Sequence, residues 1–185
     1  GGKDATVVRE FDLEKREFVP RGFELPESKS GVMWLDQDTL IVKAAFKESE
    51  RTDSGYSRVI KLWKRGTPLK DAPTLFEGKK EDVSVGAGIL KREDGKKYTT
   101  FHRSYNFFEG DSFLVNDKGE LVRIPVPLDA AGEGSFKGNL LLTLKSDWVF
   151  QSITFKQGSL VYVNLDQFIQ GGEITVELVF EPTDK

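Results

Sequence analysis

The sequence predicts an all-β fold, a partial β-propeller of three to four four-stranded antiparallel blades, and its clearest sign is one central run. Residues 56–65 read Y-S-R-V-I-K-L-W-K-R. Side chains alternate between the faces of a strand, so Ile60 and Leu62 lie on one face. Val59 and Trp63 then lie on the other. A half-solvated strand is apolar on one face only, so this run indicates sheets packed on both sides, as in a propeller blade.

A second sign is the spacing of four similar strand endings. They recur after roughly 50–60 residues, near the period of a propeller blade, and each interval holds about four strand candidates. We therefore expect a single segment with blades near residues 4–27, 28–80, 81–130 and 131–185. An ordinary β-sandwich with repeated hairpins stays an alternative. The four endings are E-F-V-P at 17–20, T-L-F-E-G at 74–78, V-R-I-P at 122–125 and L-V-F-E-P at 178–182.

Composition is the third sign and excludes several classes of function. The 185 residues include 14 Phe, 3 Trp and 4 Tyr, which favour strands. The balance of 27 Lys and Arg against 30 Asp and Glu leaves no basic stripe for nucleic acid. The absence of Cys excludes disulfides, thiolate metal sites and cysteine nucleophiles. No apolar run approaches the ~20 residues that span a bilayer. The opening Gly1-Gly2 predicts that residues 1–3 are a tag or cloning remnant.

The first half of the chain predicts hairpins separated by polar or Pro- and Gly-containing turns. Gly66 and Pro68 end the central run, because Gly permits positive φ and Pro has no N–H for a ladder. The expected elements are strands 5–11 and 15–19, a loop around Pro20, Gly22 and Pro26, strands 31–35 and 39–46 joined by a turn at 36–38, a polar loop at 47–55, the central run, and a short strand at 74–77.

The second half predicts more strands and one helical turn that ends at Gly171-Gly172. No longer helix is expected, because no long window shows a 3.6-residue period. The expected elements are a short strand at 82–85, a turn at 86–88, a long aromatic strand at 96–108, a hairpin of 112–116 and 120–126, a small-residue loop at 129–138, strands 140–144, 148–155 and 158–164, the helical turn at 166–170 and a last strand at 174–180.

Two arrangements could suggest hydrolytic chemistry, and neither is complete. His102, the single histidine, shares a predicted strand face with Ser104, which could mimic a base and its nucleophile. A triad also needs an orienting carboxylate and an oxyanion hole, so we interpret His102 as a structural residue bonded to a neighbouring blade. Ser135 lies in G-S-F-K-G, whose spacing is not that of the G-x-S-x-G nucleophile turn. We expect a flexible surface loop there.

Other candidate sites have simpler interpretations. The loop carboxylates do not follow the order of a calcium loop and are expected to be solvated turn residues. Gly86-Ala87-Gly88 resembles part of a phosphate loop, but no helix follows it. The tryptophans could stack on sugars, although Trp63 is expected to be buried. The carboxylates are Asp36, Asp38, Glu48, Glu50 and Asp53, and the other tryptophans are Trp34 and Trp148.

Five stretches carry a resemblance to a known family. They are W-L-D-Q-D-T-L-I-V (34–42), D-S-G-Y-S-R-V-I-K-L-W-K-R-G-T-P-L (53–69), L-F-E-G with D-V-S-V (75–85), L-L-L-T-L-K-S-D-W (140–148) and G-S-L-V-Y-V-N-L-D-Q-F (158–168). Together they resemble the N-terminal propeller of bacterial prolyl-oligopeptidase-like serine peptidases. The resemblance implies a seven-bladed propeller that caps an α/β-hydrolase domain with a Ser/Asp/His triad. At about 50 residues per blade, three to four blades fit, so we expect a piece of a longer protein without that domain.

The resemblance implies a non-catalytic segment that gates the active site of a peptidase acting on short peptides. The expected partners are the absent α/β-hydrolase domain and short peptides, with no nucleic acid and no membrane, and exposed blade edges predict self-association. No catalytic, cofactor or metal residue is assigned, and the gating residues are not identified. The alternative is a stand-alone β binding module for carbohydrate or peptide. The compartment, cytoplasm or periplasm, stays open.

Overall fold

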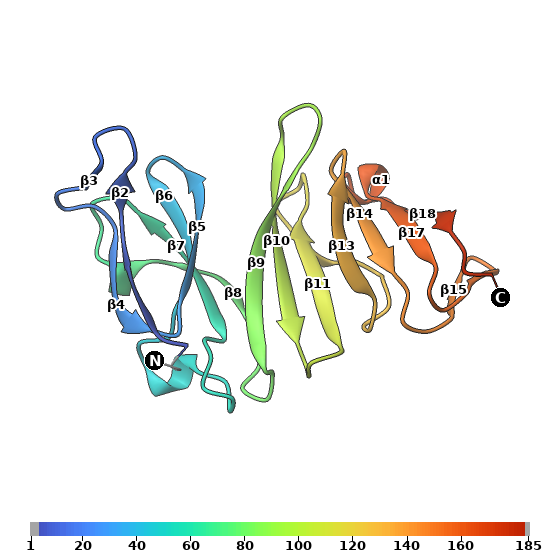
Figure 1. Cartoon of the computed structure of the whole chain (residues 1–185), viewed down its shortest axis with the longest axis horizontal. Coiled ribbons are helices and arrows are strands. Elements are labelled where there is room, and N and C mark those ends of the chain that lie inside the picture. The colour runs from blue at the N-terminus through green and yellow to red at the C-terminus, as the bar shows by residue number, and fades with distance from the viewer. Residues whose placement is uncertain (1–3, 184–185) are drawn as a thin grey trace. The chain divides into compact units, whose positions relative to one another are not determined.

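The computed structural model describes residues 4–183 and is built almost wholly of antiparallel strands (Figure 1). This confirms the predicted all-β class. The chain divides into two compact units, Gly1–Ala87 and Gly88–Lys185. Among the described residues, no helix combines the length and the apolar character needed to cross a bilayer. The proposed tag remnant at residues 1–3 lies outside the described residues, and the expected blade limits stay a prediction.

The N-terminal strands of the first unit pair differently from the predicted hairpin. Strand β1 (Thr6–Arg9) pairs with β4 (Glu24–Ser28), while β2 (Phe11–Asp12) pairs with β3 (Glu17–Phe18). The loop expected around Pro26 is therefore wrong, because β4 contains this proline. The β1–β4 register shifts between Thr6 and Val8, opposite Pro26. A proline is tolerated at such an irregularity of an edge pair, where its missing N–H costs no regular ladder bond.

The first four-stranded sheet has the order β5 (Gly31–Asp36), β6 (Thr39–Lys43), β7 (Val59–Lys64) and β8 (Thr74–Glu77). Strand β7 is the core of the predicted central run. Val59 and Trp63 on one face and Ile60 on the other are all buried. The prediction that both faces are covered is thus confirmed. Two short 3₁₀ turns, Glu48–Glu50 and Leu69–Asp71, lie in the connections on either side of β7.

The second four-stranded sheet has the order β12 (Leu121–Arg123), β11 (Gly110–Val115), β10 (Lys97–Ser104) and β9 (Ser84–Lys91). The turn expected at residues 86–88 is wrong, because all three residues lie inside β9. A side chain at position 88 would place its Cβ 2.8 Å from Oγ1 of Thr100. Glycine in a strand often marks such a close approach, so it does not mark a turn here.

The last sheet has the order β13 (Ala131–Phe136), β14 (Asn139–Thr143), β17 (Leu160–Asn164) and β18 (Thr175–Phe180), with helix α1 (Asp166–Ile169) between β17 and β18. The loop expected at 129–138 is largely strand β13. The single strand expected at 148–155 is a hairpin of β15 (Trp148–Phe150) and β16 (Ile153–Phe155). Its turn residues Gln151 and Ser152 have positive φ, which reverses the chain without glycine.

Both four-stranded sheets of the second unit contribute to one hydrophobic core. Leu90 and Leu114 come from the β9–β12 sheet, and Val161 and Val163 come from the last sheet. Arg92, which follows β9, adds polar contacts. Its guanidinium donates to the carbonyl oxygen of Gly138 at 3.2 Å and to the Asp166 carboxylate. These contacts join the end of β9 to the β13–β14 turn and to helix α1.

Candidate functional site

The turn between β10 and β11 exposes two phenylalanines. The side chains of Phe107 and Phe108 are 92% and 83% exposed, respectively. The expected strand 96–108 is therefore too long, since β10 ends at Ser104 and these aromatics belong to the turn. Phe107 and Phe108 are adjacent, and contiguous exposed apolar surface often marks an interaction site.

Hydrogen bonds hold this turn in one shape. The side-chain oxygen of Asn106 accepts the backbone N–H groups of Phe108 and Glu109, each at 2.8 Å. The Asn106 side-chain nitrogen donates to Glu109 Oε2 at 2.8 Å, and the N–H of Tyr105 donates to the carbonyl of Glu109 at 2.9 Å. Asparagine commonly bonds backbone groups two or three residues ahead in this way. The two phenyl rings are thus presented by an ordered turn.

A buried carboxylate supports the base of the turn. Asp111 accepts hydrogen bonds from the Tyr105 hydroxyl and from Nε of Arg123. These bonds lower the pKa of Asp111, although its burial alone would raise it. The hydrogen bond to Asp111, together with burial and the negative charge of Asp111, raises the pKa of Tyr105 in turn. Tyr105 is therefore anchored to β11 two residues before the exposed phenylalanines.

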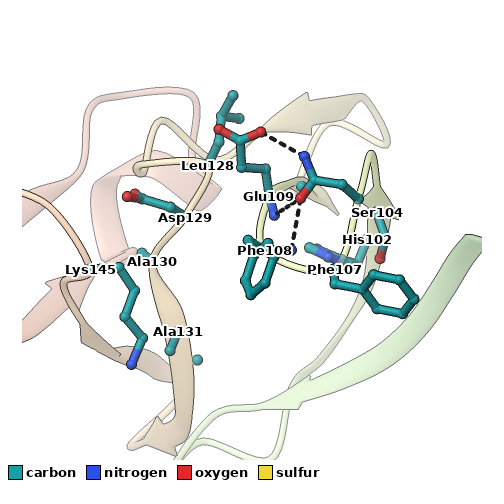
Figure 2. A pocket seen from close by; sticks show the side chains of 13 residues that line it. His102, Ser104, Phe107, Phe108, Glu109, Leu128, Asp129, Ala130, Ala131 and Lys145 are labelled. Carbon is teal, nitrogen blue, oxygen red and sulfur yellow. Dashed lines mark hydrogen bonds between the residues drawn. The ribbon is translucent and has the colours of Figure 1, made fainter. Parts of the chain in front are cut away.

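The turn forms one wall of a cavity of about 890 Å³ within the second unit (Figure 2). This volume lies in the range of small-molecule sites, roughly 300–1,000 Å³. The opposite wall comes from the segment that leads from β12 into β13 and from Lys145, which follows β14. The lining residues are His102, Ser104, Asn106, Phe107, Phe108, Glu109, Gly110, Leu128, Asp129, Ala130, Ala131, Gly132 and Lys145.

Two charged side chains of the cavity are without a charged partner. Within residues 4–183, neither Asp129 nor Lys145 takes part in an ion pair or a side-chain hydrogen bond. Figure 2 shows both on the wall opposite His102, with their charged ends pointing in different directions. The cavity thus has an apolar shelf at the turn and two charged residues on the opposite wall, with the Asp129 carboxylate directed away from the shelf in Figure 2.

His102 is held within its own sheet, which corrects the expected bond to a neighbouring blade. Its Nδ1 lies 3.3 Å from Oγ of Ser112, the residue opposite it on β11. The ring also packs over Gly110. The residue as a whole is exposed, yet neighbouring atoms shield the ring from water enough to lower the pKa of His102. Sequence reasoning missed Ser112 because the partner is set by the strand register.

The structure does not build catalytic machinery around this histidine. Ser104 also lines the cavity, but it lies opposite Gly110 in the register, and the imidazole bonds Ser112 instead. Asp111, whose negative charge acts on the His102 ring, is occupied by Tyr105 and Arg123. It is therefore not free to orient the imidazole as a triad requires.

Ser135 lies in a strand, so the flexible loop expected around it is wrong. It belongs to β13, an edge strand of the last sheet, and pairs with Leu140 of β14. After β13 ends at Phe136, Lys137 and Gly138 both have positive φ and turn the chain directly into β14. A nucleophile turn would lead from a strand into a helix, and this segment leads from one strand into another.

The candidate cation-binding carboxylates each have a hydrogen-bond or ion-pair partner. Asp36 accepts the N–H of Asp38, and Asp38 pairs with Nε of Arg65 at 2.9 Å. Within the described chain, no three His, Cys, Asp or Glu residues are grouped to hold a metal ion. Other pairs join Glu48 to Arg51 at 4.0 Å and Asp53 to Lys80 at 3.3 Å.

Glu50 corrects the expectation that all five carboxylates are solvated. Its side chain is only 13% exposed and lies 2.7 Å from Nζ of Lys61. Lys61 belongs to β7 and is buried, so a charged pair occupies part of the sheet face that the alternation assigns to Val59 and Trp63. Burial of a lysine is tolerated when it is paired, and the sequence shows no partner because Glu50 lies in a separate loop.

The tryptophans are engaged by neighbouring groups. Trp63 is buried as expected, and its indole N–H donates to the carbonyl of Thr67 at 2.7 Å. Trp34 is half-exposed, with its ring edge-to-face with Phe23 at 5.5 Å. Trp148 packs against Phe150 within its own hairpin strand. The aromatic residues with the most open faces are instead Phe107 and Phe108. Only the turn residues Asn106 and Gly110 around them could have indicated this from sequence.

Comparisons with known proteins agree on one family. Residues 1–104 match the family described as prolyl oligopeptidase, N-terminal beta-propeller domain. An uncharacterized peptidase of Sinorhizobium fredii (strain NBRC 101917 / NGR234) is 42% identical over 170 residues, which cover 89% of this chain and 23% of that protein. An uncharacterized peptidase of Rickettsia prowazekii (strain Madrid E) is 33% identical over 199 residues, which cover 100% of this chain and 27% of that protein.

A solved structure supports the same relationship. The post-proline cleaving enzyme from Rickettsia typhi matches with a TM-score of 0.88 and 34% identity, over 99% of this chain and 28% of that one. The predicted partial β-propeller is thus confirmed. The chain spans between 23% and 28% of the length of these relatives.

Proposed function

The chain belongs to the family of prolyl oligopeptidase N-terminal β-propeller domains, and on that premise we propose that it helps to gate the active site of a longer serine peptidase. The observation that carries the proposal is the match over 99% of this chain to 28% of a post-proline cleaving enzyme. The proposed partner is an α/β-hydrolase domain, and the proposed substrates are short peptides that pass the propeller.

The proposed role of the segment is exclusion. A propeller over the active site would admit short peptides, reject folded chains and keep water out of the site. The sheets described above are suited to this role because their cores are buried on both sides of β7 and between the two sheets of the second unit. Rigid blades would keep an entrance narrow.

Catalysis is assigned to the rest of the proposed peptidase. The sequence contains no G-x-S-x-G motif, and His102 bonds Ser112 and packs over Gly110. The 185-residue chain by itself should therefore hydrolyse no proline-containing chromogenic peptide. Hydrolysis by the purified chain that disappears on Ser104→Ala or Ser112→Ala would overturn this assignment.

The gating proposal is tested on the full-length protein that contains this segment. A chromogenic tetrapeptide and the same tetrapeptide sequence inside a long unfolded polypeptide would be compared by kcat/KM. We expect much faster turnover of the tetrapeptide, because the propeller would obstruct the long chain. Equal values for the two substrates would contradict gating.

A stand-alone binding module is the second candidate function, and the cavity of the second unit is the observation that favours it. A peptide-binding or carbohydrate-binding module needs an open site with exposed aromatic side chains, and Phe107 and Phe108 provide such a surface. Binding of a ligand by the isolated chain, with no contribution to peptidase selectivity in the full-length protein, would favour this alternative.

A further inference from the structure

A pocket of about 270 Å³ lies within the first unit and contains a buried charged group. We call it the Lys61 pocket. Its walls come from β4, from the loop that follows β6, from β7 and from the 3₁₀ turn Leu69–Asp71. The volume is just below the roughly 300–1,000 Å³ of sites for drug-sized ligands, so the pocket has room for a compact molecule.

Lys61 has more hydrogen-bond donors than the protein satisfies. Its side chain is only 9% exposed, and its ammonium group carries three N–H donors. Among residues 4–183 this group donates to one acceptor, Oε1 of Glu50, at 2.7 Å. The second oxygen of Glu50 accepts the backbone N–H groups of Phe46 at 2.9 Å and Lys47 at 3.3 Å. Because a buried donor without an acceptor costs free energy, the remaining N–H groups of Lys61 favour a ligand that accepts hydrogen bonds in the pocket.

The charges around Lys61 favour a ligand with a single negative charge. Burial acts to raise the pKa of Glu50, but the hydrogen bonds from Lys61 and from two backbone N–H groups outweigh it and lower the pKa, so this carboxylate stays ionised at neutral pH. Lys47 and Lys70 are exposed and have no ion pair within the described chain. Three lysines and two glutamates, the second being Glu24, leave one positive charge in the pocket. A monoanion would neutralise it, whereas a dianion would leave an excess of negative charge.

The rest of the lining is apolar. It is formed by Pro26 of β4, Phe46 in the loop after β6 and Leu69 in the 3₁₀ turn. Phe46 is 41% exposed, and Leu69 packs against the neighbouring core. Apolar surface beside an ammonium group suits an organic anion, because burial of its hydrocarbon part is favourable while the lysines bind its charged end. A small inorganic anion would leave this apolar surface in water.

We propose that the Lys61 pocket binds a small organic monocarboxylate with a compact apolar body, such as an arylacetate. The carboxylate accepts the free N–H groups of Lys61 and is attracted by the positive charges of Lys47 and Lys70. The apolar body contacts Phe46 and Leu69. This site goes beyond the proposed gating function, because it lies within the first unit and needs no hydrolase domain.

Titration of the isotope-labelled 185-residue chain, followed by two-dimensional NMR of its backbone amides, tests the site. We expect phenylacetate to saturate with a Kd of about 1 mM or tighter and to shift the amides of residues 46–50, 61 and 69–70 most. Phenylacetamide has the same shape without the charge, and acetate lacks the ring. Each should bind about tenfold more weakly or worse. Equal affinities for phenylacetate and either of these compounds would contradict the proposal.

The exposed lysines provide the variant test, because replacing the buried lysine would leave its glutamate partner buried and unpaired and would destabilise the fold. Lys47→Gln combined with Lys70→Gln should weaken phenylacetate binding about tenfold and leave the weak binding of phenylacetamide unchanged. Lys64→Gln combined with Lys79→Gln is the control, because it removes two charges from exposed positions outside the pocket. The thermal unfolding midpoint without ligand should stay constant in both double variants.

The apolar contact has a separate readout. Phe46→Ala should weaken phenylacetate binding about fivefold or more and leave acetate binding unchanged. Phe18→Ala is the control, because Phe18 is also an exposed residue of the first unit but does not line the pocket.

Three further results would overturn the inference. They are the absence of saturation by phenylacetate, an equal loss of affinity in the two double lysine variants, and amide shifts centred outside the pocket. The outcome is separate from the test of gating. Selectivity for short substrates in the full-length protein without phenylacetate binding would reject the site and leave gating intact, and phenylacetate binding with equal turnover of short and long substrates would do the reverse.

Discussion

Gly110 is the residue at which one added methyl group has the clearest expected effect. A Cβ at this position would lie 2.3 Å from the carbonyl oxygen of Arg103 and 2.6 Å from two atoms of the His102 ring. The ring could rotate away, but the carbonyl belongs to the adjacent strand and cannot move alone. The contact between His102 and Ser112 thus depends on glycine at position 110.

We therefore predict that Gly110→Ala lowers the free energy of unfolding by about 1–3 kcal/mol, the usual cost of overpacking. Urea unfolding followed by fluorescence measures it. Gly86→Ala is the matched control, because Gly86 also lies in a strand and has no atom within 4 Å of the added Cβ. Both substitutions reduce the freedom of the unfolded chain equally. Equal stabilities for the two variants would contradict the prediction.

Contacts that depend on a partner strand or on a separate loop are the hardest to predict from the sequence. The alternation in residues 56–65 was sufficient to place Val59, Ile60 and Trp63 in the interior, because burial of apolar side chains is a property of the strand itself. The buried Lys61–Glu50 pair and the contact of His102 with Ser112 needed a loop position and a strand register. Neither can be read from local sequence.

At the scale of elements, Arg65 connects the N-terminal strands to the hairpin of β6 and β7. Its guanidinium donates to both oxygens of Glu10, at 2.8 and 2.9 Å, and to Asp38 at 2.9 Å. Glu10 lies between β1 and β2 and also accepts the N–H of Phe23 at 2.9 Å. One ion pair therefore joins segments that are 55 residues apart in the chain.

This connection predicts a loss of stability in acid. The hydrogen bond from Arg65, assisted by the N–H of Phe23, holds the pKa of Glu10 below its ordinary value of 4.5. In the unfolded chain the carboxyl returns to that value and binds a proton at higher pH. The stabilisation is thus complete above the ordinary pKa and is lost as the pH falls through the lower folded value.

Glu10→Gln should remove this part of the pH dependence and cost about 1.5–3 kcal/mol at neutral pH, the range for hydrogen bonds to charged groups. Chemical unfolding at a series of acidic pH values measures both effects. Glu17→Gln, an exposed residue of β3, is the control and should change neither. An unchanged acid profile for Glu10→Gln would mean that the Arg65 contact does not stabilise the fold.

Elements were predicted well where turn chemistry was explicit and poorly where glycine or proline occurred inside strands. The turn at 36–38 forms as expected, with the Asp36 side chain accepting the N–H of Asp38 at 2.8 Å. The sequence predicts loops or turns for parts of β4, β9 and β13, because these strands contain Pro26, Gly86–Gly88 and Gly132–Gly134. Edge irregularities, close approach of backbones and tertiary pairing override those local signals.

At the scale of the whole molecule, the spacing of strand endings was the useful signal. A period of roughly 50–60 residues predicts repeated four-stranded sheets, and the described residues form three of them, within 31–77, 84–123 and 131–180. The expected blade limits stay a prediction. The cavity could not be foreseen in the same way. Its walls come from segments 128–132 and 102–110 and from Lys145, which become neighbours only when two sheets pack around a shared core.

The last sheet predicts how the isolated chain behaves at high concentration. Strand β18 is an edge strand, and its residues Leu178, Val179 and Phe180 are exposed. An edge strand offers unpaired backbone groups, and its apolar side chains add area that a second copy can bury. We therefore predict concentration-dependent self-association of the 185-residue chain through β18, measured by light scattering and sedimentation velocity.

A lysine on this edge should weaken self-association, because natural edge strands use such charges to prevent pairing. We expect Val179→Lys to shift the sedimentation profile toward monomer while leaving the unfolding midpoint unchanged, since Val179 is exposed. Thr154→Lys adds the same charge to the exposed surface of β16 and is the control. If the unmodified chain is strictly monomeric at high concentration, β18 does not act as a pairing edge. If both lysine variants dissociate the oligomer equally, the contact depends on net charge and not on this strand.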